Sequence, residues 1–230
     1  MSQCATCHAG CCRSFAVPVS GADILRIQKQ QNLSFWDFVC RWADSKGEIA
    51  LNHAPQFYFN DEPQTPFVIC LRHEASAQFP GTARCQFLQE GAPTAENPLG
   101  ISKCGIYADR PAACRAFPAR MNSTGELAIV YDIPRFGRKE EIPAYRLCGR
   151  AWRPQDLDPI QHVQDLVVAQ FEMNFFHRLA AAWNRRPGVW SDFPQFLEFV
   201  YAERVQADER VDVPEAPAEE PVVRYPRIAA

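Results

Sequence analysis

Hydrophobic and polar positions follow two different periods along the chain, and these predict helices and strands in turn. Near the N-terminus, Ser20-Gly-Ala-Asp23 predicts the start of a helix, because the Ser20 hydroxyl can cap the first turn while the Asp23 carboxylate reaches back to the cap. This helix should end near Asn32. Its inward-facing residues should be Ile24, Leu25 and Ile27.

The same start signal recurs at Ser34-Phe-Trp-Asp37 and predicts a second helix. The residues that should face the core from this helix are Phe35, Phe38, Val39 and Trp42. Cys40 would then lie in the middle of an amphipathic helix. We interpret it as a small buried hydrophobic residue.

Residues 48–75 have the pattern of short strands. Phe57-Tyr-Phe59 alternates, and Phe67-Val-Ile-Cys70-Leu is a short apolar run in which Cys70 should also be buried. Residues 76–118 are irregular, with Gly and Pro around three cysteines. A further strand is predicted at residues 127–131, after a turn at residues 122–125.

The clearest helical pattern runs from about Asp156 to Asn184. We interpret the apolar residues that recur there at steps of three or four as one buried stripe: Ile160, Val163, Val167, Phe171, Phe175, Leu179 and Trp183. Another helix is predicted at about residues 193–205. After Ala207 the chain is rich in Pro, Glu and Val without a period, which predicts a disordered tail.

The composition is that of an ordinary globular protein. Of the 230 residues, 47% are hydrophobic and 22% are charged, and the formal net charge of −3 gives no basic surface for nucleic acid. No apolar run is long enough to span a membrane, and residues 1–12 do not have the pattern of a secretory signal. We therefore expect a cytoplasmic protein that binds neither membrane nor nucleic acid and forms few stable disulfides.

In such a reducing compartment, ten cysteines indicate metal or redox chemistry. Setting aside Cys40 and Cys70 leaves eight candidate metal ligands: Cys4, Cys7, Cys11, Cys12, Cys85, Cys104, Cys114 and Cys148. Most of them fall in predicted loops, which can aim several ligands at one point. Many also have a basic neighbour, which would offset thiolate charge and lower the pKa of the thiol.

The spacing of these cysteines leaves the metal open. Cys4 and Cys7 have the two-residue gap with which a tight loop grips one metal ion, whereas Cys11 and Cys12 are adjacent and indicate two metal ions or a polynuclear centre. The other ligands are single residues far apart, which favours iron or an iron–sulfur cluster slightly over zinc. His8 is a further possible ligand, and Cys4-Ala-Thr-Cys7-His8 without an export signal does not indicate haem attachment.

These motifs resemble the YkgJ-type cysteine-cluster family, also called the CxxCxxCC or zinc- or iron-chelating family. The resemblance covers about residues 4–150 and is most specific from Cys104 to Pro118. The matching motifs are Cys4-Ala-Thr-Cys7 with Cys11-Cys12, the segment Val17-Pro-Val-Ser-Gly-Ala-Asp23-Ile, Cys85-Gln-Phe-Leu88, Cys104-Gly-Ile-Tyr107, Arg110-Pro111, Cys114-Arg115-Ala-Phe117-Pro118 and Cys148. One departure is that three residues, not two, separate Cys7 from Cys11.

The resemblance implies that the eight candidate cysteines bind metal. A similar cluster in bacterial flagellin lysine methylases implies, as the alternative, a metal-dependent protein-modifying enzyme that uses S-adenosylmethionine. A third possibility is an interaction protein whose C-terminal helices bind a protein partner. Tyr107, Arg110 and Arg115 lie in the most specific block, where we expect the two arginines to neutralise thiolates and brace the loop.

Together these features predict an α+β fold in which short strands and irregular, metal-tied loops pack on several helices. Residues 1–150 would form a cysteine-cluster metal-binding domain. Residues 151–206 would form a helical extension packed on it, and residues 207–230 the disordered tail. The predicted function is that of a cytoplasmic metal-binding protein without assigned chemistry.

Overall fold

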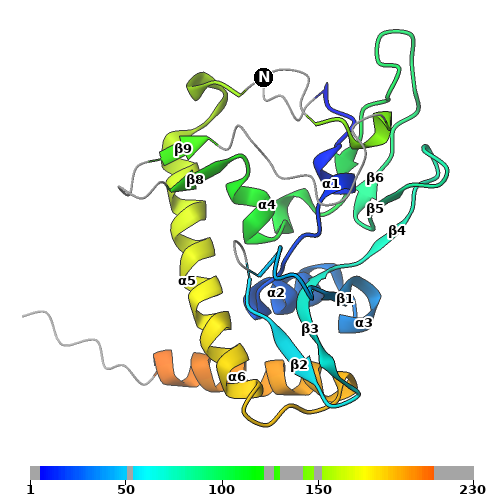
Figure 1. The fold of residues 1–230 in the computed structure, drawn as a ribbon. Helices are drawn as coiled ribbons and strands as arrows, with labels where there is room; N and C mark the ends of the chain where they lie inside the picture. The colour runs from blue at the N-terminus through cyan, green and yellow to red at the C-terminus, as the bar shows by residue number, and fades with distance from the viewer. Residues whose placement is uncertain (1–5, 51–53, 122–126, 130–141, 148–151, 210–230) are drawn as a thin grey trace, which may run out of the picture.

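The computed structural model describes residues 6–50, 54–121, 127–129, 142–147 and 152–209, and these residues form an α+β fold (Figure 1). The helices are α1 (Cys11–Ser14), α2 (Gly21–Gln31), α3 (Phe35–Phe38), α4 (Ala112–Ala116), α5 (Pro159–Trp183) and α6 (Phe193–Glu209). In this part of the chain, no helix is long and apolar enough to cross a membrane. The predicted α+β class is confirmed.

Helix α2 begins and ends where the sequence predicts. Ser20 and Asp23 form the full capping box, and Asn32 ends the helix in the left-handed conformation with φ of 52°. Such a conformation is tolerated by Asn better than by most residues. Ile24 and Ile27 are fully buried, as predicted, and Leu25 packs against the core at its edge.

The predicted second helix is too long. Helix α3 stops at Phe38, and the next residues form strand β1 (Val39–Ala43), so Cys40 lies in a strand and not in a helix. The β-branched and aromatic residues of this segment favour a strand. Pairing with β3 (Glu62–Leu71) supplies backbone hydrogen bonds that outweigh the local helical pattern.

Strands β1 and β3 belong to a three-stranded antiparallel sheet, with β3 in the centre and β2 (Phe57–Phe59) on its other side. The two strands predicted from the apolar pattern are thus present. The remaining strands of the described residues form three two-stranded antiparallel sheets: β4 (His73–Ala75) with β5 (Ala83–Cys85), β6 (Leu88–Gln89) with β7 (Lys103–Cys104), and β8 (Ala119–Met121) with β9 (Leu127–Ile129). Single 3-10 turns complete the described chain at η2 (Tyr107–Asp109), η3 (Pro143–Tyr145), η4 (Pro154–Asp156) and η5 (Trp190–Asp192).

The main core lies between this sheet and helices α5 and α6. Phe57 and Phe59 are fully buried, and their rings lie 5.0 Å and 5.5 Å from the ring of Phe193. Trp183 packs edge-on against Phe193 at 5.2 Å, and its indole N–H donates to the carbonyl of Tyr58 at 2.8 Å. Burial of each such ring stabilises the fold by about 2 kcal/mol.

The predicted single stripe on α5 is wrong in its first half. Ile160 and Phe171 are 71% and 57% exposed, whereas Leu179 and Trp183 are buried. The apolar residues recur mostly at steps of four, and each such step rotates about 40° around the helix axis. From Val163 to Trp183 the rotation adds up to about 200°, so the two ends of the stripe face opposite sides of the helix.

Helix α5 runs along one side of the molecule and α6 crosses below it (Figure 1). The upper half of α5 contacts α4 and β8, and its lower half contacts α2 and β2. Helix α6 confirms the helix predicted at about residues 193–205 and extends it to Glu209. The rest of the predicted tail and the predicted turn at 122–125 lie outside the described residues, and the proposed division into domains stays a prediction.

Candidate metal centre

Helix α1 carries the adjacent pair Cys11 and Cys12, in a segment expected to be a loop. Their sulfur atoms are 4.0 Å apart. The side chain of Ser14, at the end of the helix, donates to the carbonyl of Tyr145 at 3.2 Å, which fixes α1 against the 3-10 turn η3. Cys7 lies just before α1, where its sulfur accepts the backbone N–H of Ala9 at 3.3 Å.

Cys85 and Cys104 end two short strands, β5 and β7. In the β6–β7 pair, Cys104 is opposite Leu88. Leu88 follows Cys85 by only three residues in the sequence. The N–H of Gly105 donates to the carbonyl of Phe87 at 2.7 Å and continues this pairing. The turn between Cys85 and Leu88 therefore brings the ends of β5 and β7 together.

Cys114 lies in the middle of α4, a helix of five residues in a region predicted to be irregular. Pro111 precedes the helix, and the N–H of Ala112 donates to the carboxylate of Asp23 at 3.0 Å. The position of Cys114 is therefore set from helix α2, far away in the sequence. Cys12, Cys104 and Cys114 all pack against the main core, of which Cys85 is a buried member.

Four thiols from four elements lie close enough to act on one another electrostatically. Burial raises the pKa of Cys114 far above its ordinary value, and the charges of Cys85, Cys11 and Cys104 raise it further. Burial also raises the pKa of Cys85 to about 12, with smaller contributions from Cys104 and Cys11. Cys11, Cys85, Cys104 and Cys114 therefore converge, and we call them the thiol cluster.

The other two members of the thiol cluster have raised pKa values as well. For Cys11 the cause is first the hydrogen bond with Cys12, then burial and the charge of Cys12. For Cys104 the cause is burial, with a smaller contribution from Cys11. All four thiols are thus protonated at neutral pH in the metal-free protein.

The arginines near the thiol cluster differ in what they contact. The charge of Arg110 lowers the pKa of both Cys104 and Cys114, against the stronger effect of burial. Arg13 instead pairs with Glu90 at 2.6 Å, and Arg115 lies 3.4 Å from Asp165. Of the basic neighbours expected to offset thiolate charge, Arg13 and Arg115 thus already have carboxylate partners.

Arg110 is held by Tyr107, the other residue singled out in this block. Its guanidinium lies over the Tyr107 ring, 3.8 Å from the centroid, and its Nε donates to the Tyr107 carbonyl at 3.0 Å. Tyr107 is 61% exposed, so this pair borders the solvent.

His8 is buried beside α1. Burial lowers its pKa, and the positive charge of Arg13 lowers it further, against a hydrogen bond with the Arg146 backbone that raises it. The imidazole is therefore neutral at pH 7, which is the form that ligates metals.

Six of the eight predicted ligands lie in the described residues. Cys4 and Cys148 lie outside them. Among residues 6–50, 54–121, 127–129, 142–147 and 152–209, no three His, Cys, Asp or Glu side chains form a group that could hold a metal ion. The thiol cluster is thus a convergence of donors, not a finished coordination shell.

Cys40 and Cys70 lie elsewhere. They are opposite each other in the register of β1 and β3. They belong to a second small core with Val68, and the charges that act on Cys70 are those of Cys40 and Asp44. This placement is that of small hydrophobic residues, although Cys40 reaches it from a strand.

Comparison with models of known protein families shows to which family this chain belongs. The model of the CxxCxxCC family, "Putative zinc- or iron-chelating domain", matches residues 3–132, which is more than half of the chain. The chain belongs to the CxxCxxCC family. The thiol cluster and helix α1 all fall within the matched residues, so the family description supports chelation of zinc or iron as the general function of this CxxCxxCC protein. No curated protein and no solved structure gives a significant match.

Two carboxylates beside the elements that carry the cysteines, Asp23 and Glu90, were not predicted as site residues. Asp23 was visible in the sequence only as a helix cap, and its contact with Ala112 spans 89 positions. Glu90 has no local pattern at all, because each of its partners lies on another element. Such residues escape sequence reasoning when their contacts are tertiary.

Proposed function

We propose that this CxxCxxCC protein binds zinc or iron in the cytoplasm through the thiolates of Cys11, Cys85, Cys104 and Cys114. Cys4, Cys7, Cys12 and Cys148 would supply the further ligands. The observation that carries the proposal is that α1, β5, β7 and α4 bring four thiols within electrostatic reach of one another. Four such thiols in one place are a donor set for a thiophilic metal.

The chemistry of the thiol cluster fits a metal ion better than it fits four free thiols. Each raised pKa reflects the cost of forming a buried thiolate beside other thiols, which the charges of Arg110 and Arg84 offset only in part. A metal ion would supply that cation and displace the protons. Binding would also draw the sulfur atoms closer together, by rotation of the partly exposed side chains of Cys11, Cys104 and Cys114.

The arrangement favours iron, as a cluster, slightly over zinc. Structural zinc sites are usually built from two close cysteine pairs, whereas these four thiols come singly from four elements. Iron–sulfur clusters accept ligands spread in this way. No contact in the described part of the chain favours the methylase alternative over plain metal binding, so we make metal binding the proposal.

The test is elemental analysis and visible absorbance of protein purified without oxygen. Several equivalents of iron and sulfide with broad visible absorption would identify an iron–sulfur protein. One or two zinc ions in colourless protein would identify zinc sites. Protein that contains neither metal and binds neither on addition would contradict the proposal.

Cysteine variants locate the ligands. Cys114→Ser or Cys104→Ser should lower the metal content, because each removes a thiolate from the thiol cluster. Cys40→Ser is the matched control and should leave the metal content unchanged, since Cys40 belongs to the second core. If all three variants keep the full metal content, the ligand assignment is wrong.

A further inference from the structure

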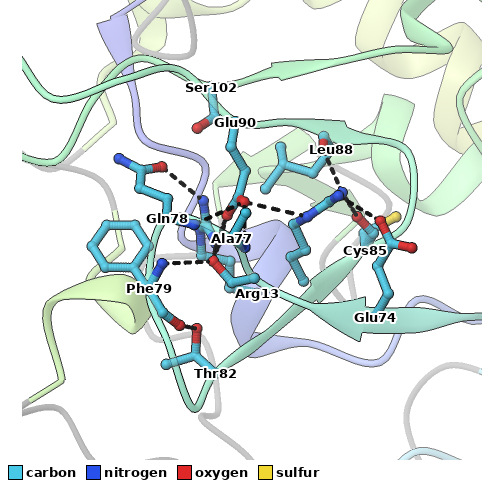
Figure 2. A network of polar contacts seen from close by, with 12 residues as sticks. Arg13, Glu74, Ala77, Gln78, Phe79, Thr82, Cys85, Leu88, Glu90 and Ser102 are labelled. Carbon is cyan, nitrogen blue, oxygen red and sulfur yellow. Dashed lines mark hydrogen bonds and ion pairs between the residues drawn. The ribbon is translucent and has the colours of Figure 1, made fainter.

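Glu90, directly after strand β6, accepts hydrogen bonds from two segments of the chain and forms an ion pair with a third (Figure 2). Its side chain is only 9% exposed. One carboxylate oxygen accepts Arg13 at 2.6 Å and the Ser76 hydroxyl at 2.5 Å. The other accepts the backbone N–H groups of Ala77 and Gln78 at 2.9 Å and 3.1 Å.

Arg13 connects Glu90 to helix α1. This arginine directly follows Cys11 and Cys12 and is fully buried. Besides its ion pair with Glu90, its guanidinium donates to Ser76 at 2.9 Å and lies 4.7 Å from the centre of the Phe79 ring. A fully buried arginine with this many contacts fixes the orientation of the helix that carries both cysteines.

Arg84 connects Glu90 to strand β5. Its Nε lies 3.5 Å from the Glu90 carboxylate, and its other end pairs with Glu74 at 2.5 Å. The same guanidinium donates to the carbonyls of Cys85 and Leu88, at 3.2 Å and 2.5 Å. Arg84 therefore holds the turn that begins at Cys85.

The charges of this network cancel internally. Arg13 and Arg84 are matched by Glu90 and Glu74, so neither arginine is left as an unpaired cation. The charge of Arg84 lowers the pKa of Cys85, but this contribution is smaller than that of burial, and the Glu90 carboxylate between the two arginines works against it. The network is better explained by a structural role, in which it holds α1 and β5 in fixed positions.

We propose that Glu90 is a positioning residue of the metal centre. It holds α1 and β5 together through Arg13 and Arg84, so that Cys11 and Cys85 are near each other before a metal binds. The helix and the strand are in direct contact, as this role requires. The inference rests on the proposed function for its metal readout, but the positioning can also be measured in the metal-free protein.

The test compares Glu90→Gln with Glu74→Gln. Both remove one carboxylate charge beside Arg84, but Glu74 does not contact Arg13 and its side chain is half exposed. Zinc affinity is measured by competition with a chromophoric chelator, and cobalt(II) binding by its thiolate charge-transfer absorption. Glu90→Gln should weaken binding about 10- to 100-fold, as losses of outer-sphere partners do, and Glu74→Gln should stay close to the wild type.

A metal-free readout separates this inference from the proposed function. Cys85 is only 6% exposed, so its alkylation, followed by mass spectrometry, requires local opening of β5. Glu90→Gln should speed this reaction about tenfold, and Glu74→Gln should not. If the wild type binds no metal but this difference is seen, the proposed function fails while the positioning role stands.

Glu90→Gln leaves Arg13 buried without a full counter-charge and can therefore unfold the chain. The variant Arg13→Met/Glu90→Gln removes both charges, which buried sites often tolerate, and should show the same loss of zinc affinity. Wild-type affinity and alkylation rate in a folded variant would overturn the inference. Unfolding of both variants would overturn it too, because Glu90 would then support the whole fold.

Discussion

Asp23 accepts a hydrogen bond at 3.0 Å from the backbone N–H of Ala112, a residue 89 positions later in the sequence. The same carboxylate accepts Arg26 at 2.8 Å and, through its other oxygen, the N–H of Ser20 at 3.2 Å. One buried side chain thus caps its own helix, α2, and the start of α4. The cap of α4 determines where Cys114 lies.

Asp23→Ala should lower the free energy of unfolding by about 2–4 kcal/mol, because it removes two caps and leaves buried donors without an acceptor. Asp37→Ala is the matched control, since Asp37 has the same place in the capping box of α3 but is exposed and serves one helix. Its cost should be about 1 kcal/mol. Urea unfolding of both variants measures the difference, and equal losses would contradict the double role of Asp23.

Gly10→Ala should destabilise the protein by about 1–3 kcal/mol through overpacking. A Cβ at Gly10 would lie 1.8 Å from the carbonyl oxygen of Arg146, so α1 and the backbone after η3 would have to move apart. Because α1 carries Cys11 and Cys12, zinc affinity should fall as well. Gly47→Ala is the control: it has φ of +69° but open space around it, so it should cost about 1 kcal/mol of backbone strain and leave zinc affinity unchanged.

The ion pair of Glu90 predicts a loss of stability in acid. Burial alone would raise the pKa of Glu90, but hydrogen bonds from Ser76 and Arg13 outweigh it and lower the pKa from 4.5 to about 2. A depressed carboxyl pKa stabilises the fold fully above the unfolded value and loses that effect as the pH falls toward the folded value. Between pH 4.5 and about 2, the free energy of unfolding of the wild type should therefore fall more than that of Glu90→Gln. Urea unfolding at several pH values in this range measures both free energies. If they fall equally with pH in the wild type and in Glu90→Gln, the Glu90 ion pair does not stabilise the fold.

Arg110→Met should shift metal binding to higher pH. The charge of Arg110 lowers the pKa of Cys104 and Cys114, so its removal makes their protons harder to displace. Zinc affinity at neutral pH should fall about three- to tenfold, and the loss should shrink as the pH rises. Arg115→Met serves as the control because Arg115 pairs with Asp165. An equal effect of both variants would mean that general charge, and not the position of Arg110, matters.

Local signals in the sequence were enough to predict α2, α6, the strands at Phe57 and Phe67, and the existence of α5. Each of these depends on a cap or a period that lies within one segment. The helix predicted across Val39 and Trp42 was wrong because pairing with β3 decides that segment. The stripe on α5 was wrong because repeated steps of four residues wind around a helix.

In the candidate site, too, features set by local sequence were predicted and features set by tertiary contacts were not. The apolar pattern around Cys40 and Cys70 separated them from the other cysteines, and the structure places both in the second core. It could not show that Cys11 and Cys12 lie on a short helix or that Cys114 lies on another. Glu90 had no local signal, because all of its partners were brought to it by the folded chain.

The thiol cluster joins positions more than a hundred residues apart, from Cys11 to Cys114. A chain that emerges from the ribosome in order cannot close this loop until the N-terminal half of its 230 residues is made. Metal binding at the thiol cluster would therefore come late in synthesis, and Cys11 and Cys12 would remain free thiols until then. Closing such a long loop is entropically costly, so a metal bound at the end would also restrict the unfolded chain and keep the finished protein from reopening.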